Sequence, residues 1–159
     1  MKLKIRIDSA DAENWTKQLL PVILKATQSG FQDFMNQVTN EVREKLTGPV
    51  LQRRTGTLVR SIHTEIQKSA TGFIGKIGSN IKYAAIHEFG GIILIPDIYP
   101  VKKQALHFFI GSKEIFAKKV KAHTITMPER SYLRSSLTEL APQAEKIIMP
   151  YIEEALKNA

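Results

Sequence analysis

Apolar residues recur at helical spacing in the N-terminal third of the chain. The stripe is Phe31, Phe34, Met35, Val38, Val42 and Leu46. Apolar positions three and four residues apart predict an amphipathic helix with one buried face. Ser9 can cap the start of this helical region, and Gly48 followed by Pro49 predicts its end. Pro21 is expected to kink or restart the helix.

A second apolar stripe lies at the C-terminal end of the chain: Leu133, Leu137, Leu140, Ala144, Ile147, Ile148, Tyr151, Ile152 and Leu156. It predicts a C-terminal helical segment, which Pro142 and Pro150 should bend or divide into two helices. Two alternatives exist for its start. Thr126 and Glu129 fit a capping box, and Ser131 can serve as the cap instead.

Between the helices, apolar and polar residues alternate in short runs. These runs predict a short helix over 81–89, which Gly90 and Gly91 stop, and strands near 62–66, 73–79, 105–110 and 123–127. The first seven residues alternate in the same way and predict a strand at 3–7. We therefore predict an α+β fold, in which a long N-terminal helix and a C-terminal helical segment pack on an antiparallel sheet of roughly four or five strands.

One apolar run does not fit an amphipathic pattern, because glycines and prolines flank it: Ile92, Ile93, Leu94 and Ile95. It is either a buried strand or an apolar loop that is buried only against another subunit. The length of 159 residues suits a single domain over 1–159, with a projecting loop around 91–104.

Composition narrows the class of protein. The chain has no cysteine, which excludes disulfides and thiolate metal sites. No apolar run is long enough for a signal peptide or a membrane span, so we expect a soluble protein made in the cytoplasm. The net charge of +8 gathers in the region from Lys102 to Lys121. This region is either a solvated surface or a nucleic-acid-binding module, in which Lys118, Lys119 and Lys121 would contact a polyanion. The solvated surface is favoured, because no recognised nucleic-acid motif accompanies the lysines.

Candidate catalytic chemistry is weak. His87 and Glu88 look like half of a zinc-protease motif, but that motif needs a second histidine at position 91, which is Gly91. The four histidines, at positions 63, 87, 107 and 123, are widely spaced, and each is expected to make one local hydrogen bond. No serine lies in a Gly-x-Ser-x-Gly elbow. We expect no enzyme, no metal and no cofactor.

Three short motifs occur in a fixed order. The first is Arg54-Thr55-Gly56-x-Leu58 with Ser61-Ile62, the second is Tyr83-Ala84-x-x-His87-Glu88-x-Gly90, and the third is Pro128-x-Arg130. From about residue 19 onward, this succession resembles the tail-completion, or virion morphogenesis, family of tailed bacteriophages and prophages. The basic region between the second and third motifs is similar to a variable region of that family.

The resemblance implies a structural, non-catalytic protein that joins or completes the tail at the head–tail neck. It implies a homo-oligomeric ring, with a hexamer as the candidate form, and no cofactor. The implied partners are other neck and tail proteins: a tail terminator, connector or stopper. The expected location is the virion, after synthesis in the cytoplasm of the bacterial host. Contact with DNA is compatible with this role and is not required by it.

The motif residues also carry physical expectations. Gly56 should follow the turn out of the long helix, where a positive φ is needed, while Leu58 and Ile62 should begin the sheet. Three side chains are expected to form a hydrogen-bonded cluster with one of two arginines: Tyr83, His87 and Glu88, with Arg54 or Arg130. Two roles stay open for these motifs, stabilisation of the protomer and direct contact with another subunit.

Overall fold

The computed structural model describes residues 9–48, 50–51, 55–101 and 104–158. The strand predicted at 3–7 lies outside the described residues. The chain divides into two compact units. The helical unit comprises the described residues of Met1–Ile81 and Tyr132–Ala159, and the ribbon unit is Lys82–Ser131. The single domain over 1–159 stays a prediction.

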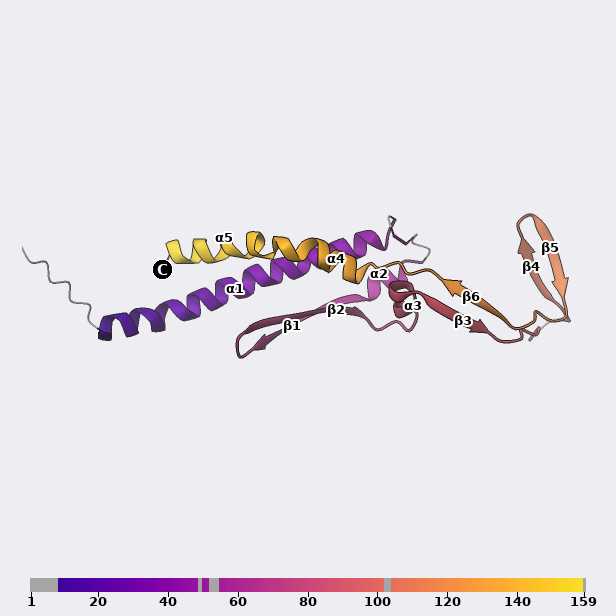
Figure 1. Ribbon diagram of the computed structural model, residues 1–159, viewed down its shortest axis with the longest axis horizontal. Coiled ribbons are helices and arrows are strands. Elements are labelled where there is room, and N and C mark those ends of the chain that lie inside the picture. The colour runs from indigo at the N-terminus through magenta and orange to yellow at the C-terminus, as the bar shows by residue number, and fades with distance from the viewer. Residues whose placement is uncertain (1–8, 49, 52–54, 102–103, 159) are drawn as a thin grey trace, which may run out of the picture. The chain divides into compact units, whose positions relative to one another are not determined.

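The helical unit contains one long helix, a β-hairpin and a C-terminal pair of helices (Figure 1). Helix α1 (Ser9–Lys45) runs unbroken through Pro21, where a kink or restart was predicted. After the short α2 (Thr57–Ser61), strands β1 (Ile62–Ser69) and β2 (Gly72–Ser79) pair antiparallel. The C-terminal segment is α4 (Leu133–Leu140), the 3₁₀ turn η1 (Ala141–Gln143) and α5 (Ala144–Lys157). Pro142 therefore divides the segment in two, as predicted, whereas α5 continues through Pro150.

The core of the helical unit is the predicted stripe of α1. Phe34, Met35 and Val38 are buried, and the hairpin contributes Ile66 and Ile77 to the cluster around them. Phe31 of α1 also packs against the cluster, and the C-terminal segment contributes Leu140, Ala144, Ile147 and Ile148. At the end of α1, the Nζ atom of Lys45 lies 2.7 Å from Oε2 of Glu139 on α4. The C-terminal helices therefore run antiparallel to α1, because the start of the segment lies beside the end of α1.

The ribbon unit contains a short helix and two antiparallel strand pairs. Helix α3 (Ala84–Phe89) leads into β3 (Gly91–Ile95), which pairs with β6 (His123–Met127). Strand β4 (Leu106–Ile110) pairs with β5 (Lys113–Ala117) in a hairpin. A bridge between Ile98 and Val120 extends the β3–β6 pairing.

The predicted α+β class, with its long N-terminal helix, C-terminal helices and antiparallel strands, is confirmed. The strand pairing differs from the prediction. In the described part of the chain, the strands form three separate two-stranded sheets, not one sheet of four or five.

Two local predictions are wrong, and one strand was missed. Leu58 lies in α2 and not at the start of the sheet. Thr126 lies in β6, so the capping box that would start there does not form, and α4 begins at Leu133 without a side-chain cap. Strand β5 was not predicted, because its sequence does not alternate: two polar residues, Lys113 and Glu114, precede three apolar ones.

Candidate functional site

The first motif forms the connection between α1 and the β1–β2 hairpin. Gly56 has φ 72°, in the left-handed region that favours glycine, so the predicted positive φ is confirmed. The backbone N–H of Thr57 donates to Oγ1 of Thr55 over 3.4 Å, and the guanidinium of Arg60 donates to the Thr55 carbonyl. Arg54 lies outside the described residues.

The later residues of this motif stabilise the helical unit. Leu58 is buried, and the hydroxyl of Ser61 donates to its carbonyl over 2.7 Å. The Ser61 hydroxyl also lies 2.7 Å from that of Ser79, which joins the start of β1 to the end of β2. Ile62 is buried, and Arg43 of α1 donates to its carbonyl over 3.2 Å. These contacts position the hairpin on α1.

The second and third motifs meet in the ribbon unit, although about forty residues separate them in the sequence. The N–H of Arg130 donates to the carbonyl of His87 over 2.9 Å. The hydroxyl of Ser131 donates to the carboxylate of Glu88 over 3.2 Å, and Glu88 is only 2% exposed. Pro128 is exposed and begins the same segment. The bond between Arg130 and His87 joins backbone atoms, so the predicted hydrogen-bonded cluster of side chains with an arginine stays a prediction. The role of Ser131 was missed because serine carries no distinctive sequence signal.

Gly90 makes this meeting of the two motifs sterically feasible. Its φ is 67° and its ψ is −170°. A Cβ atom at this position would lie 2.7 Å from the backbone N of Glu129 and 2.9 Å from the carbonyl O of Met127. Both are backbone atoms that cannot move aside as a side chain can. The glycine therefore permits close packing between the end of α3 and the chain that follows β6.

His87 lies partly buried in the middle of this junction. Its Nδ1 atom is buried without a hydrogen-bond partner, and the ring of Tyr83 meets the imidazole edge-on at 5.9 Å. Burial, and then the positive charge of Arg130, hold the pKa of His87 below its usual value. Ala84, one turn before Glu88, is buried. The predicted local hydrogen bond is found for the other three histidines: His63, His107 and His123.

The apolar run after this junction forms a strand, yet much of it is exposed. Ile92 and Leu94 share one face of β3 and are 71% and 72% exposed. Ile93 and Ile95 point to the other face and are partly buried. Ile93 pairs with Ile125 of β6, which is also exposed. The β3–β6 ribbon therefore carries isoleucine or leucine on both of its faces. The run is a strand, but not the buried strand of the first alternative, and its burial against another subunit stays a prediction.

Lys119 of the basic region forms an ion pair with Asp97. The Nζ atom of Lys119 lies 2.6 Å from Oδ2 of Asp97 and also sits over the ring of Tyr99. This hydrogen bond lowers the pKa of Asp97, with a further contribution from the N–H of Ala122, and raises the pKa of Lys119. Lys118 and Lys121 are exposed. Asp97 was missed in the sequence because a single acid in an apolar loop indicates no partner.

The sequence matches a known protein family over most of its length. The model of the phage virion morphogenesis family matches residues 26–157. The chain belongs to this family. No curated protein and no solved structure matches it.

Membership gives the chain a structural role in building a phage particle and makes it a virion component. The family match spans both units and includes all three motifs. In the described ranges, no three histidine, cysteine or acidic side chains gather in a way that could hold a metal ion. Among the described helices, none is both long and apolar enough to cross a membrane.

Proposed function

We propose that this virion morphogenesis protein completes the tail at the head–tail neck, where copies of it assemble into a ring without any catalytic step. A hexamer is the proposed ring. The proposed neighbours are a tail terminator, connector or stopper protein. Family membership supports the structural role.

The observation that carries the proposal is the exposed apolar face of the β3–β6 ribbon. A two-stranded ribbon is marginally stable by itself, and contiguous exposed apolar side chains usually mark an interaction surface. Ile92 and Leu94 lie on one face with Thr124 and Thr126 across the strand pair. Burying this face against another copy or a neck protein would remove apolar surface from water, at roughly 25 cal/mol per Å².

Two variants of this one face test the proposal. Ile92→Ser with Leu94→Ser removes the apolar side chains, and Thr124→Ser with Thr126→Ser is the matched control on the facing strand. All four side chains are exposed, so both variants should fold. We expect the first variant to lose assembly in light scattering with purified tails and to fail to complete them, while the control behaves like the wild type. Full tail completion by the first variant would contradict the proposed interface.

A further inference from the structure

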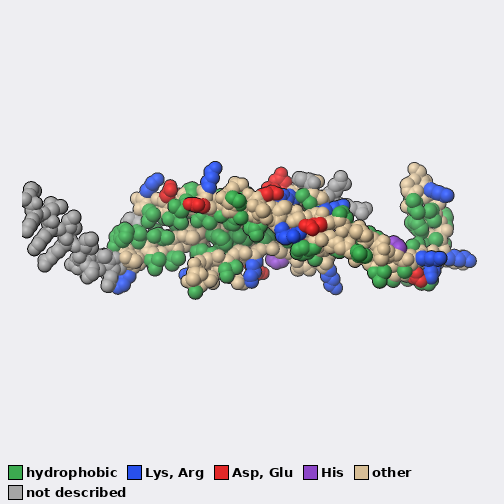
Figure 2. All heavy atoms as spheres, viewed as in Figure 1, with side chains coloured by type: hydrophobic (Ala, Val, Ile, Leu, Met, Phe, Trp, Pro, Cys, Tyr) green, Lys and Arg blue, Asp and Glu red, His purple; other side chains and the backbone are tan. Residues whose placement is uncertain are grey.

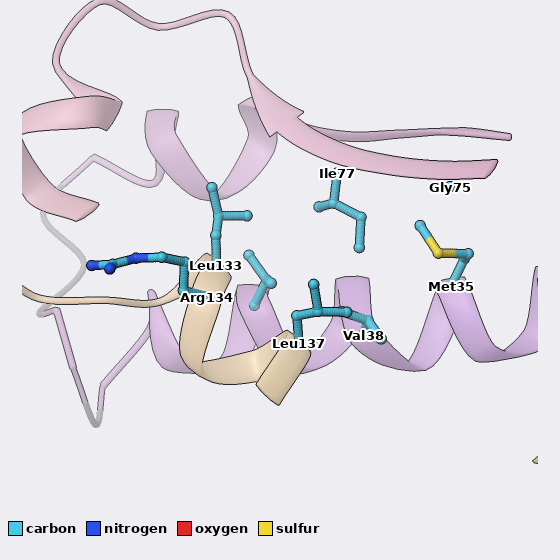
Figure 3. A pocket seen from close by; sticks show the side chains of 8 residues that line it. Met35, Val38, Gly75, Ile77, Leu133, Arg134 and Leu137 are labelled. Atoms are coloured by element: carbon cyan, nitrogen blue, oxygen red, sulfur yellow. The ribbon is translucent and has the colours of Figure 1, made fainter. Parts of the chain in front are cut away.

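The helical unit contains an apolar cleft beside its core (Figure 3). It has a volume of about 170 Å³ and lies between α1, β2 and α4. Its lining is Met35, Val38, Val42, Gly75, Ile77, Leu133, Arg134 and Leu137. Figure 3 shows aliphatic side chains pointing together from the three elements, whereas the guanidinium of Arg134 extends away from them. The cleft is thus apolar inside with one cation beside it.

The size of the cleft restricts what it can hold. Sites for drug-sized molecules usually measure about 300–1,000 Å³. A cavity of about 150 Å³ accommodates one benzene molecule. The cleft therefore suits a single aromatic or large aliphatic side chain better than a small-molecule ligand or cofactor.

The same chain carries an exposed aromatic face of matching chemistry. In the β4–β5 hairpin, Phe109 is paired with Glu114, and His107 is paired with Phe116. Directly opposed residues share one face of an antiparallel pair, so these four side chains lie together. Phe109 and Phe116 are 63% and 66% exposed. Figure 2 shows hydrophobic side chains gathered over this hairpin.

Charge complements this apolar match. Glu114 lies directly across from Phe109 on the strand pair. Its Oε1 atom lies 2.6 Å from Nε2 of His107, and the Glu114 side chain is still about half exposed. A ring of Phe109 inside the cleft would thus bring a carboxylate with it, beside the guanidinium of Arg134. The His107 ring contacts both phenylalanines: it stacks on Phe116 with centroids 4.7 Å apart and meets Phe109 edge-on at 5.2 Å. Phe116 is less suited, because the stacked imidazole covers one face of its ring.

We propose that Phe109 of one copy inserts into this cleft of a second copy, with Glu114 of the first copy facing Arg134 of the second. The contact joins two different surfaces, so it is heterologous, and its repetition can close a ring. The inference rests on the proposed function, since it requires that copies of the chain assemble with one another.

Cross-linking between single-cysteine variants tests this contact, because the chain has no cysteine of its own. One copy carries Ser112→Cys at the hairpin turn, and the other carries Thr138→Cys, one residue beyond Leu137 on α4. A short bifunctional maleimide can then join only different molecules. We expect a product of two chains by intact mass. The matched control replaces Thr138→Cys with Gln67→Cys, an exposed position on β1, and should give little product.

Side-chain changes then identify the contact. Phe109→Ser should reduce the cross-linked yield about tenfold or more, as expected for a central aromatic anchor. Phe116→Ser should change it much less. Glu114→Arg or Arg134→Glu alone should lower the yield, and the two variants mixed should restore it. Equal yields for Thr138→Cys and Gln67→Cys, or no response to Phe109→Ser, would overturn the inference. Tail completion that still depends on Ile92 and Leu94 would leave the proposed function intact in that case.

Discussion

Replacing Gly90 with alanine should destabilise the ribbon unit strongly. The backbone at Gly90, with φ 67° and ψ −170°, lies in a region that is accessible essentially only to glycine. Strain of this kind costs about 1–3 kcal/mol. The new Cβ would also approach the N of Glu129 to 2.7 Å and the O of Met127 to 2.9 Å, closer than real Cβ atoms come. Overpacking of this kind adds about 1–3 kcal/mol, so we expect a total loss of about 2–6 kcal/mol.

Gly111 provides the matched control for this prediction. It also has a positive φ, of 61°, but a Cβ there would meet no atom within 4 Å. Gly111→Ala should therefore cost only the conformational penalty of about 1–2 kcal/mol. The comparison separates the collision at Gly90 from backbone strain alone.

Hydrogen exchange and urea denaturation measure the two effects. In Gly90→Ala, amides of β3 and β6 should lose protection, because the collision lies where α3 meets the chain after β6. In Gly111→Ala, the loss should be small and limited to the β4–β5 hairpin. Equal destabilisation by the two variants would refute the claim that close packing fixes the glycine at the end of the second motif.

Three further predictions concern single side chains. Thr39→Val removes the 2.6 Å hydrogen bond between the hydroxyls of Thr39 and Thr64 and the 2.7 Å bond that the Thr39 hydroxyl donates to the Met35 carbonyl. It should lower the free energy of unfolding by about 1–3 kcal/mol in urea denaturation. In a chain that already carries Thr39→Val, Thr64→Val should lower the free energy of unfolding by less than it does in the wild type. Equal losses in the two backgrounds would argue against coupling between α1 and β1 through these hydroxyls. Burial and then Arg130 hold the pKa of His87 below 6.5, so the unfolded chain takes up its proton first, and stability should fall as the pH drops through 6.5 toward the lower folded-state pKa. His87→Gln should flatten thermal-melting temperatures over this window, and an unchanged pH dependence would exclude His87 as the cause. Lys118→Ala should leave tail completion unaltered, and titration with duplex DNA should be flat; salt-sensitive binding that Lys118→Ala weakens would instead support the nucleic-acid alternative.

Helices were predictable from the sequence because each contains its own signal. The stripe around Phe34 and Val38 fixes which face of α1 is buried, and Pro142 marks the division of the C-terminal segment. Strand pairing has no comparable local signal. Alternation shows that a run is extended but does not identify its neighbour, so one larger sheet was predicted where the described strands form three pairs. At Thr126, the strand and cap signals overlap, and the strand prevailed.

The candidate site was predictable in its parts and not in its assembly. The positive φ of Gly56 was predicted, whereas Gly90 was expected only to end the short helix and also has a positive φ. The bond between Ser131 and Glu88 joins residues 43 positions apart, and only the fold brings them together. The exposure of Ile92 and Leu94 could not be predicted either, because an apolar run looks the same whether its own chain or a partner buries it.

Deletion of the gene in the phage or prophage that encodes this protein tests the central claim most directly. Electron microscopy of the lysate, with and without the wild-type gene supplied in trans, would count joined and separate particles. The proposed function predicts that heads and tails accumulate unjoined in the deletion, and that the wild-type gene restores infectious particles. Normal numbers of joined, infectious particles without the gene would contradict it.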